Sequence, residues 1–254
     1  MRSLASASLD ESLRLLLHDA QAALLDLYGP WLDRLILFGS RARGDHRPDS
    51  DVDLLVVLDD QRRTLPDELR EAEYVEIIVD LLLKHDLLLS VVPVTRSRLA
   101  ANQEPLFWHV QEEGITLFDM EELIQKLMDQ AREHLTDAAF LIEERERVRG
   151  SMELVYYAMF YAAEAALLRM GTSVKSHSGL IQQFSLKLIK PGAIERDYVT
   201  MLARAFDARQ KTTYVFAEDQ SLDQVKARYQ DATQFVARIE RYLSEPDRQA
   251  DSSP

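Results

Sequence analysis

The sequence predicts an α+β fold in which an N-terminal α/β domain is followed by an all-α bundle. Three short apolar runs, at residues 35–38, 52–58 and 87–94, have the length and composition of buried strands. Amphipathic patterns with helical spacing alternate with these runs, as in α/β domains. From residue 119 onward only helical patterns follow, which predicts a separate helical bundle.

The length of the chain also favours two domains. With 254 residues and 46% hydrophobic content, the chain can form two modest cores. We expect the α/β domain at residues 1–119 and the helical bundle at 120–245. The polar residues 246–254 predict a disordered tail.

The first predicted helix leads into the first predicted strand. Ser8 and Glu11 have the Ser-x-x-Glu spacing of a capping box, and leucines at helical spacing follow until Gly29. The strand at residues 35–38 then places Gly39 at its C-terminal end. Open α/β sheets commonly bind ligands at that position.

The rest of the first half contains two further helices and two further strands. Residues 67–84 have the pattern of an amphipathic helix, and residues 87–94 follow it as the third strand. A short helix at residues 105–114 is expected to pack Phe107, Trp108 and Val110 inward. Residues 115–118 are then expected to form an edge strand that closes the domain.

The second half is predicted to consist of helices alone. A long amphipathic helix is expected at residues 120–145, and further helices are expected from Ser176, from Ile194 and from Ser221. Residues 151–169 are apolar on nearly every side. Such a helix belongs at the centre of a bundle.

Charge and composition limit the partners of the chain. With 30 Lys and Arg against 43 Asp and Glu, the formal charge is −13, so a basic groove for nucleic acid is not expected. Cysteine is absent, which excludes disulfides and thiolate metal sites. The start lacks the apolar core of a signal peptide, and no run is long enough to span a membrane. We expect a cytoplasmic protein without a membrane partner.

The most informative stretch joins a Gly-Ser pair to two aspartates. Asp51 and Asp53 alternate along a strand, so they point the same way, about 6–7 Å apart. Such a pair suits Mg²⁺, which takes oxygen ligands and keeps positions for water and phosphate. Gly39 lets the backbone approach a ligand closely, and Ser40 adds a hydroxyl. Together they predict a metal–nucleotide site.

At these residues the chain resembles the polymerase-β-like nucleotidyltransferases, most closely the minimal nucleotidyltransferases. Their signature is Gly-Ser, about ten residues, then Asp-x-Asp, and the resemblance extends over roughly residues 8–118. It implies that Gly39 and Ser40 grip the triphosphate of an NTP, expected to be ATP. It also implies that Asp51 and Asp53 are the catalytic Mg²⁺ ligands.

Three neighbouring residues complete the expected nucleotide site. Arg41 and Arg43 stand in the loop after Gly-Ser, where guanidinium groups could contact the triphosphate or the departing pyrophosphate. Ser50 directly precedes the aspartate pair. We therefore expect Arg41, Arg43 and Ser50 to bind the nucleotide.

The third strand departs from the pattern of this superfamily. Active members carry a third carboxylate there, which completes the metal site and helps to deprotonate the acceptor hydroxyl. Residues 87–94 contain no acid; Ser90 occupies the expected position and Asp86 stands too early. Loss of a general base costs on the order of 10²–10⁴-fold in rate. A nucleotide-binding regulatory protein without transferase activity is therefore one alternative.

The second half resembles the HEPN domains, which are helical partners of minimal nucleotidyltransferases. The resemblance rests on the runs 156–163 and 175–179 and on the segment from Arg209 to Tyr214, and it spans about residues 125–244. HEPN bundles often pair, so a homodimer is expected.

The ribonuclease signature of the HEPN group is incomplete in this chain. Ribonuclease members carry Arg-x4–6-His on a late helix, whereas here Tyr214 stands where the histidine belongs. Phe216 stands where some members have a modifiable tyrosine. We therefore do not expect RNA cleavage.

These observations favour a Mg²⁺-dependent enzyme. It would transfer AMP from ATP to a hydroxyl of a protein or a small molecule. The pairing resembles toxin–antitoxin modules in which a nucleotidyltransferase silences a HEPN partner, although here both are in one chain. An aminoglycoside-type antibiotic nucleotidyltransferase is a second alternative, because an acidic cleft would suit cationic acceptors.

Overall fold

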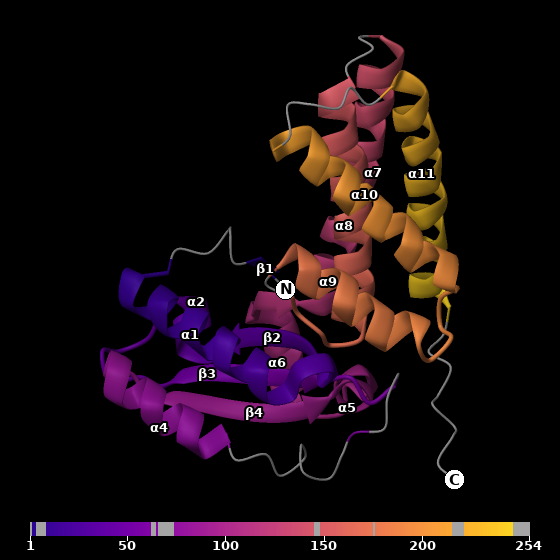
Figure 1. Cartoon of the computed structure of the whole chain (residues 1–254). Helices are drawn as coiled ribbons and strands as arrows, with labels where there is room; N and C mark the ends of the chain where they lie inside the picture. The colour runs from indigo at the N-terminus through magenta and orange to yellow at the C-terminus, as the bar shows by residue number, and fades with distance from the viewer. Residues whose placement is uncertain are drawn as a thin grey trace. The chain divides into compact units, whose positions relative to one another are not determined.

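The chain folds into two compact units, Met1–Glu121 and Glu122–Pro246 (Figure 1). The computed structural model describes residues 2–3, 9–61, 65, 74–144, 148–174, 176–214 and 221–245. The predicted disordered tail, residues 246–254, lies outside these described residues.

The described part of the first unit forms a five-stranded sheet with the order β1-β5-β2-β3-β4. Its strands are β1 (Arg2–Ser3), β2 (Leu32–Phe38), β3 (Val52–Leu58), β4 (Leu89–Thr95) and β5 (Ile115–Asp119). Strand β2 runs antiparallel to β3 and β5, whereas β3 and β4 are parallel. The C-terminal end of β2 therefore lies at the same edge as the N-terminal ends of β3 and β4.

Helix α4 (Tyr74–His85) belongs to the crossover between the parallel strands β3 and β4. The predicted helix at residues 67–84 covers this segment, but its part before Tyr74 lies outside the described residues. A parallel pair needs a crossover of this kind, because its two strands cannot be joined by a tight hairpin.

Two short helices, α5 (Arg96–Ala101) and α6 (Pro105–Glu113), cover one face of the sheet. Alternate residues of β2 and β3 point to that face and pack with residues of both helices in one buried cluster: Ile36, Phe38, Leu55, Val57, Leu99, Phe107 and Val110. Leu35 and Leu37 alternate with these residues of β2, so they point to the opposite face of the sheet, where they are also fully buried. Helix α1 (Glu11–Tyr28) contacts both β2 and α4, and it packs against this opposite face.

The start of α1 differs from the prediction. The N-cap residue is Asp10, whose carboxylate accepts a hydrogen bond of 2.8 Å from the backbone N–H of Leu13. Because a short carboxylate at this position satisfies the third helical N–H, a cap at Ser8 is not needed. The predicted Ser8–Glu11 capping box is therefore wrong, and Ser8 itself lies outside the described residues.

Two details around α6 and β5 also correct the predictions. Phe107 and Val110 are buried, but Trp108 is 51% exposed and donates its indole N–H to the carbonyl of Asn102. Residues 107 and 110 share a helix face, and residue 108 is turned by about 100° from it. Strand β5 is not an edge strand, because β1 pairs with its outer side.

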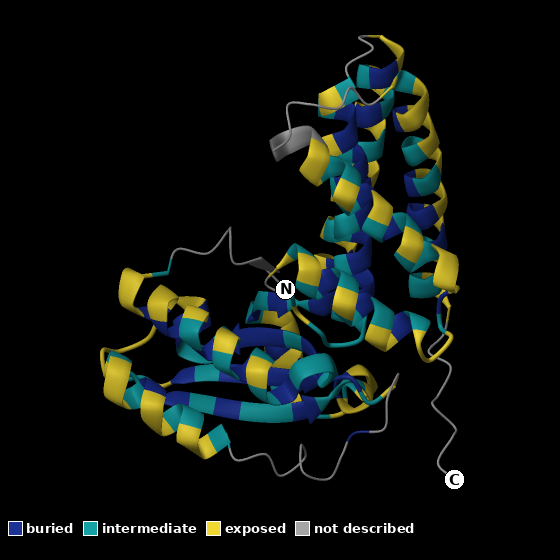
Figure 2. Cartoon of the chain, in the orientation of Figure 1, coloured by how far each residue is buried: buried dark blue, intermediate teal, exposed yellow. Residues whose placement is uncertain are grey.

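The second unit is helical throughout its described residues. Its elements are α7 (Met120–Glu143), α8 (Val148–Arg169), α9 (His177–Phe184), the π-helical η3 (Ser185–Ile189), α10 (Arg196–Tyr214) and α11 (Leu222–Ser244). Helix α8 contacts α9, α10 and α11, and its buried residues cover most of its circumference (Figure 2). The prediction of a central helix at residues 151–169 is confirmed.

Small polar residues and glycine set the boundaries of these helices. Ser176 caps α9 by accepting from the backbone N–H of Gly179, and Ser221 forms a reciprocal capping box with Gln224 at the start of α11. Gly171 follows α8 with a φ of 69°. Within the described part of the chain, no helix is long and apolar enough to cross a membrane.

Candidate functional site

The predicted aspartates lie close to Gly39, where β2 ends and β3 begins. In the strand register, Asp53 of β3 lies opposite Phe38 on one side and Ser90 of β4 on the other. Asp51 directly precedes β3 and is exposed, whereas Asp53 is half-buried. The structure therefore brings Gly39, Asp51 and Asp53 together, with Ser90 beside them.

Gly39 is in close contact with the Asp53 side chain. Its φ is +75°, and a Cβ atom at this position would overlap the Asp53 carboxylate. Instead of a simple turn, Gly39 and Ser40 begin the short helix α2 (Gly39–Arg43), which ends at Gly44. Only glycine combines this backbone conformation with this approach to Asp53.

A residue that the sequence did not reveal also reaches Gly39. The Glu113 carboxylate at the end of α6 accepts a 3.1 Å hydrogen bond from the Gly39 N–H. The same carboxylate accepts from Nη1 of Arg43 at 2.8 and 3.0 Å. No local pattern could have indicated this contact, because 74 residues separate Glu113 from Gly39.

The two arginines of the motif have different environments. Arg43 is 44% exposed and points its guanidinium to Glu113 and Asp45. Arg41 is buried, and its Nε donates to the Ser50 carbonyl at 2.9 Å, with a longer contact to the Pro48 carbonyl. Arg41 therefore supports the loop before β3 through its Nε and Nη2.

Ser50 also shapes this loop. Its hydroxyl accepts a 2.9 Å hydrogen bond from the backbone N–H of Arg47, and its carbonyl accepts from Arg41. These contacts fix the chain immediately before Asp51.

The electrostatics of Asp53 favour a positively charged partner. Burial raises the pKa of Asp53, and the neighbouring charge of Asp51 raises it further. The hydrogen bond from the Ser90 hydroxyl and the charge of Arg43 oppose this rise. Two carboxylates close together, one of them half-buried, repel each other unless a cation or a proton lies between them.

The donor set at this edge fits a hard cation. Asp51 and Asp53 offer carboxylate oxygens and Ser90 offers a hydroxyl oxygen, which are ligand types that Mg²⁺ accepts. Among the described residues, no three acidic, histidine or cysteine side chains form a metal cluster. A cation here would complete its coordination with water and phosphate oxygens, as Mg²⁺ usually does.

Asp86 does not replace the missing third acid. It has a φ of 55°, directly after α4, and its N–H donates to the Leu82 carbonyl. Since Ser90 is the residue paired with Asp53, Asp86 stands four positions too early.

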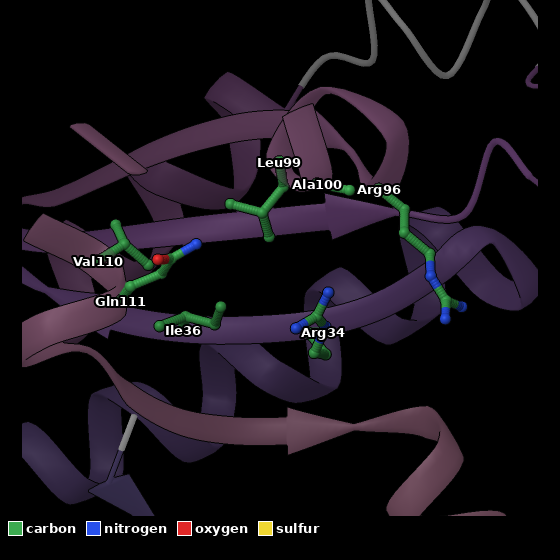
Figure 3. A pocket seen from close by; sticks show the side chains of 7 residues that line it. All are labelled: Arg34, Ile36, Arg96, Leu99, Ala100, Val110 and Gln111. Atoms are coloured by element: carbon green, nitrogen blue, oxygen red, sulfur yellow. The ribbon is translucent and has the colours of Figure 1, made fainter. Parts of the chain in front are cut away.

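A cavity of about 180 Å³ lies elsewhere in the first unit, on the face covered by α5 and α6 (Figure 3). Val110 and Gln111 line one end, and Arg34 and Arg96 line the other. Both guanidinium groups bind the buried carboxylate of Asp33, at 2.9 and 3.3 Å. None of the predicted site residues lines this cavity.

The helical unit contains a second cluster of polar side chains, formed from α8, α9 and α10. Nδ1 of His177 lies 2.7 Å from the Tyr156 hydroxyl. Arg209 donates to the Tyr157 hydroxyl at 3.1 Å, and its guanidinium lies 5.3 and 5.1 Å from the ring centroids of Tyr156 and Tyr157. The fold thus brings a histidine of α9 close to an arginine of α10.

The Arg-x4–6-His pattern places the histidine on the helix of Arg209, so it does not indicate a histidine on another helix. The side chain of Tyr214 is not described, and Phe216 lies outside the described residues. Ser176 makes the helix-start hydrogen bond of α9, and His177 bonds Tyr156.

Comparison with known proteins identifies both halves. The nucleotidyltransferase domain family matches residues 21–107, and the HEPN domain family matches residues 124–242. A candidate toxin of Methanocaldococcus jannaschii is 32% identical over 127 residues, which cover 50% of this chain and 93% of that protein. A candidate protein adenylyltransferase of the same organism is 39% identical over 61 residues, covering 24% of this chain and 58% of that protein.

Among solved structures, the chain is similar to a spectinomycin adenyltransferase from Enterococcus faecialis, solved with ATP and spectinomycin. The identity is 11% and the TM-score 0.30, over 89% of this chain and 99% of that one. The two matched domains account for both compact units of the structure. The chain therefore belongs to the proteins that join a nucleotidyltransferase domain to a HEPN domain.

Proposed function

We propose that this protein transfers AMP from ATP to a hydroxyl group of a protein or a small molecule, in a Mg²⁺-dependent reaction. The observation that carries the proposal is the half-buried Asp53 carboxylate against Gly39, with Asp51 beside it, in a nucleotidyltransferase domain. A close pair of carboxylates next to backbone N–H donors can hold a metal-bound triphosphate.

Each residue of the edge has a role in this proposal. Asp51 and Asp53 would hold Mg²⁺, which would neutralise charge on the phosphates when bound. The Gly39 N–H, the Ser40 hydroxyl and the Arg43 guanidinium would hold phosphate oxygens. Arg41 and Ser50 would keep the loop before Asp51 in place, as their hydrogen bonds indicate.

The transfer step exchanges one phosphorus–oxygen bond for another. The acceptor oxygen forms a bond to the α-phosphorus, and the bond from that phosphorus to the bridging oxygen breaks, so pyrophosphate leaves. The acceptor hydroxyl gives its proton to water, since Ser90 stands where a carboxylate would accept it. A slower reaction than in enzymes with a third acid is therefore expected.

The charge of the chain supports a cationic acceptor. The formal charge is −13, and a negative surface attracts positively charged molecules. Basic proteins and hydroxylated cationic antibiotics of the aminoglycoside type are therefore the first acceptors to test.

The test uses the full chain with ATP labelled on its α-phosphate, Mg²⁺, and either cell extract or a panel of cationic antibiotics. Label should pass to an acceptor, and Asp51→Asn and Asp53→Asn should abolish the transfer. Asp80→Asn, which removes an exposed carboxylate on α4, should leave it intact. Label from γ-labelled ATP should not be transferred.

A second candidate function is nucleotide binding without transfer, and the specific observation that favours it is Ser90 beside Asp53. Binding of ATP with Mg²⁺ that depends on Asp51, with no labelled product in any mixture, would support this regulatory role. It would also exclude the transferase proposal.

A further inference from the structure

Glu113 binds the donors that the proposed function assigns to phosphate. Its side chain is 16% exposed, so it is largely enclosed at the end of α6. One oxygen accepts from both the Gly39 N–H and Arg43, and the other accepts from Arg43. The Glu113 carboxylate therefore already occupies the position in which a phosphate would bind these donors.

A phosphate oxygen and a carboxylate oxygen make equivalent contacts with an N–H and a guanidinium group. The Gly39 N–H can serve only one of them, because Glu113 already accepts its hydrogen. A phosphate that binds at this position must therefore displace the Glu113 carboxylate.

Arg43 has a second anchor that remains when Glu113 leaves. Its Nε donates to the Asp45 carboxylate at 3.1 Å, on the opposite side of the guanidinium from Nη1. The hydrogen bonds that Arg43 donates to the Glu113 and Asp45 carboxylates raise the pKa of Arg43, so it stays charged. The guanidinium is thus held in position to donate to a phosphate oxygen in place of Glu113.

We propose that Glu113 competes with phosphate for Gly39 and Arg43, and so lowers the affinity of the site for every phosphate that takes these donors. This inference rests on the proposed function. A triphosphate that is also anchored through Mg²⁺ at Asp51 and Asp53 displaces Glu113, because it gains contacts that the carboxylate does not have. The free-energy cost of displacing Glu113 is the same for a monophosphate such as AMP, which gains fewer contacts and therefore binds more weakly.

The test measures dissociation constants for ATP and AMP with Mg²⁺ by calorimetry on the full chain. Glu113→Gln keeps the size of the side chain but removes its charge, so it should tighten ATP binding by about 3- to 10-fold. It should tighten AMP binding by the same factor, because the same carboxylate no longer competes for these donors.

Glu104→Gln is the matched control. Glu104 directly precedes α6, at the opposite end of the helix from Glu113, and accepts hydrogen bonds of 2.7 and 2.9 Å from Arg98. This variant therefore removes the same charge from another ion pair. Its affinities for both nucleotides should equal those of the natural chain. Melting temperatures of the two variants show whether either one perturbs the fold.

The double variant Arg43→Ala, Glu113→Gln tests the mechanism. Without Arg43, the gain from Glu113→Gln should shrink, because one of the contested donors is gone. Unchanged or weaker ATP binding in Glu113→Gln, with binding by the natural chain intact, would overturn the inference alone. Failure of the natural chain to bind ATP with Mg²⁺ would overturn the proposed function as well.

Discussion

Asp53 of β3 and Ser90 of β4 occupy paired positions on neighbouring parallel strands, and the Ser90 hydroxyl hydrogen-bonds the Asp53 carboxylate. Paired residues on adjacent strands point to the same face of the sheet. An aspartate side chain at position 90, which is longer than serine, would therefore lie beside the Asp53 carboxylate. The serine instead adds one neutral oxygen and lowers the pKa of Asp53, against the effect of burial.

Ser90→Asp is expected to create the missing carboxylate. Without metal, a third negative charge beside Asp51 and Asp53 should lower the melting temperature of the first unit. With Mg²⁺ the same charge becomes a ligand, so apparent Mg²⁺ affinity should rise about tenfold. Melting curves recorded over a series of MgCl₂ concentrations measure both effects.

Ser90→Asn controls for size, because asparagine has nearly the shape of aspartate and no charge. It should leave Mg²⁺ affinity near that of the natural chain. Equal Mg²⁺ responses of the two variants would contradict a metal role for this edge of the sheet.

Gly39→Ala and Gly44→Ala separate backbone conformation from contact. Both glycines have positive φ, +75° and +85°, but only a Cβ at Gly39 would meet the Asp53 carboxylate. Gly44→Ala should cost about 1 kcal/mol in free energy of unfolding. Gly39→Ala should cost about 1–3 kcal/mol more, because Asp53 must move.

Urea unfolding monitored by tryptophan fluorescence measures this difference. The two tryptophans, Trp31 and Trp108, both belong to the first unit, so their signal reports that unit alone. Equal costs for the two substitutions would show that Asp53 does not press against Gly39.

The parts of the fold that depend on neighbours in sequence could be predicted. Short apolar runs indicated β2, β3 and β4, and an all-round apolar pattern indicated the central helix α8. Gly39, Asp51 and Asp53 also lie near one another along the chain. They come together because β2 and β3 are consecutive antiparallel strands, so the end of one lies beside the start of the other.

Contacts between distant elements could not be predicted in this way. Glu113 reaches Gly39, and His177 lies near Arg209, only because helices pack in a particular arrangement. Periodicity gives the buried face of a helix but not the partner of each side chain. The same limit applies to the start of α1, where the local pattern favoured Ser8 and the N-cap is Asp10.

Arg41 is expected to stabilise the loop before β3. Lysine at this position keeps the charge, but its donors all lie on one nitrogen, whereas Arg41 reaches the carbonyls of Ser50 and Pro48 from Nε and Nη2. Arg41→Lys should therefore lower the free energy of unfolding by about 1–2 kcal/mol. It should also speed proteolysis within residues 44–51, measured by mass spectrometry of the fragments.

Arg47→Lys is the control for this loop. Arg47 is exposed and uses its backbone N–H, which lysine retains, to bind Ser50. Stability and cleavage should stay near those of the natural chain. If Arg41→Lys behaves in the same way as Arg47→Lys, Arg41 does not support the loop.

His177 should make the stability of the helical unit depend on pH. Burial lowers the pKa of His177, and the positive charge of Arg209 lowers it further. Nδ1 of His177 lies 2.7 Å from the Tyr156 hydroxyl, and the rings of Tyr157, Phe160 and Phe206 surround the imidazole. Protonation would place a second cation beside Arg209 in these largely aromatic surroundings.

The sign of the effect follows from the two pKa values. In the unfolded chain the pKa of the histidine is about 6.5, and in the folded chain its pKa is lower. The unfolded state therefore takes up a proton first as pH falls. The stabilising contribution of His177 is complete above about pH 6.5 and is lost progressively below it.

Chemical denaturation followed by circular dichroism at pH 7.5 and pH 5.5 tests this expectation on the full chain. The natural chain should lose more stability on acidification than His177→Gln, whose side chain does not titrate. His109→Gln, which removes an exposed histidine from the other unit, should lose as much stability as the natural chain. NMR titration of the imidazole signals gives the direct measurement, since the His177 resonance should titrate at lower pH than that of a histidine peptide. A His177 signal that titrates above the peptide value would mean that the cluster holds a charged imidazole, and stability would then rise on acidification.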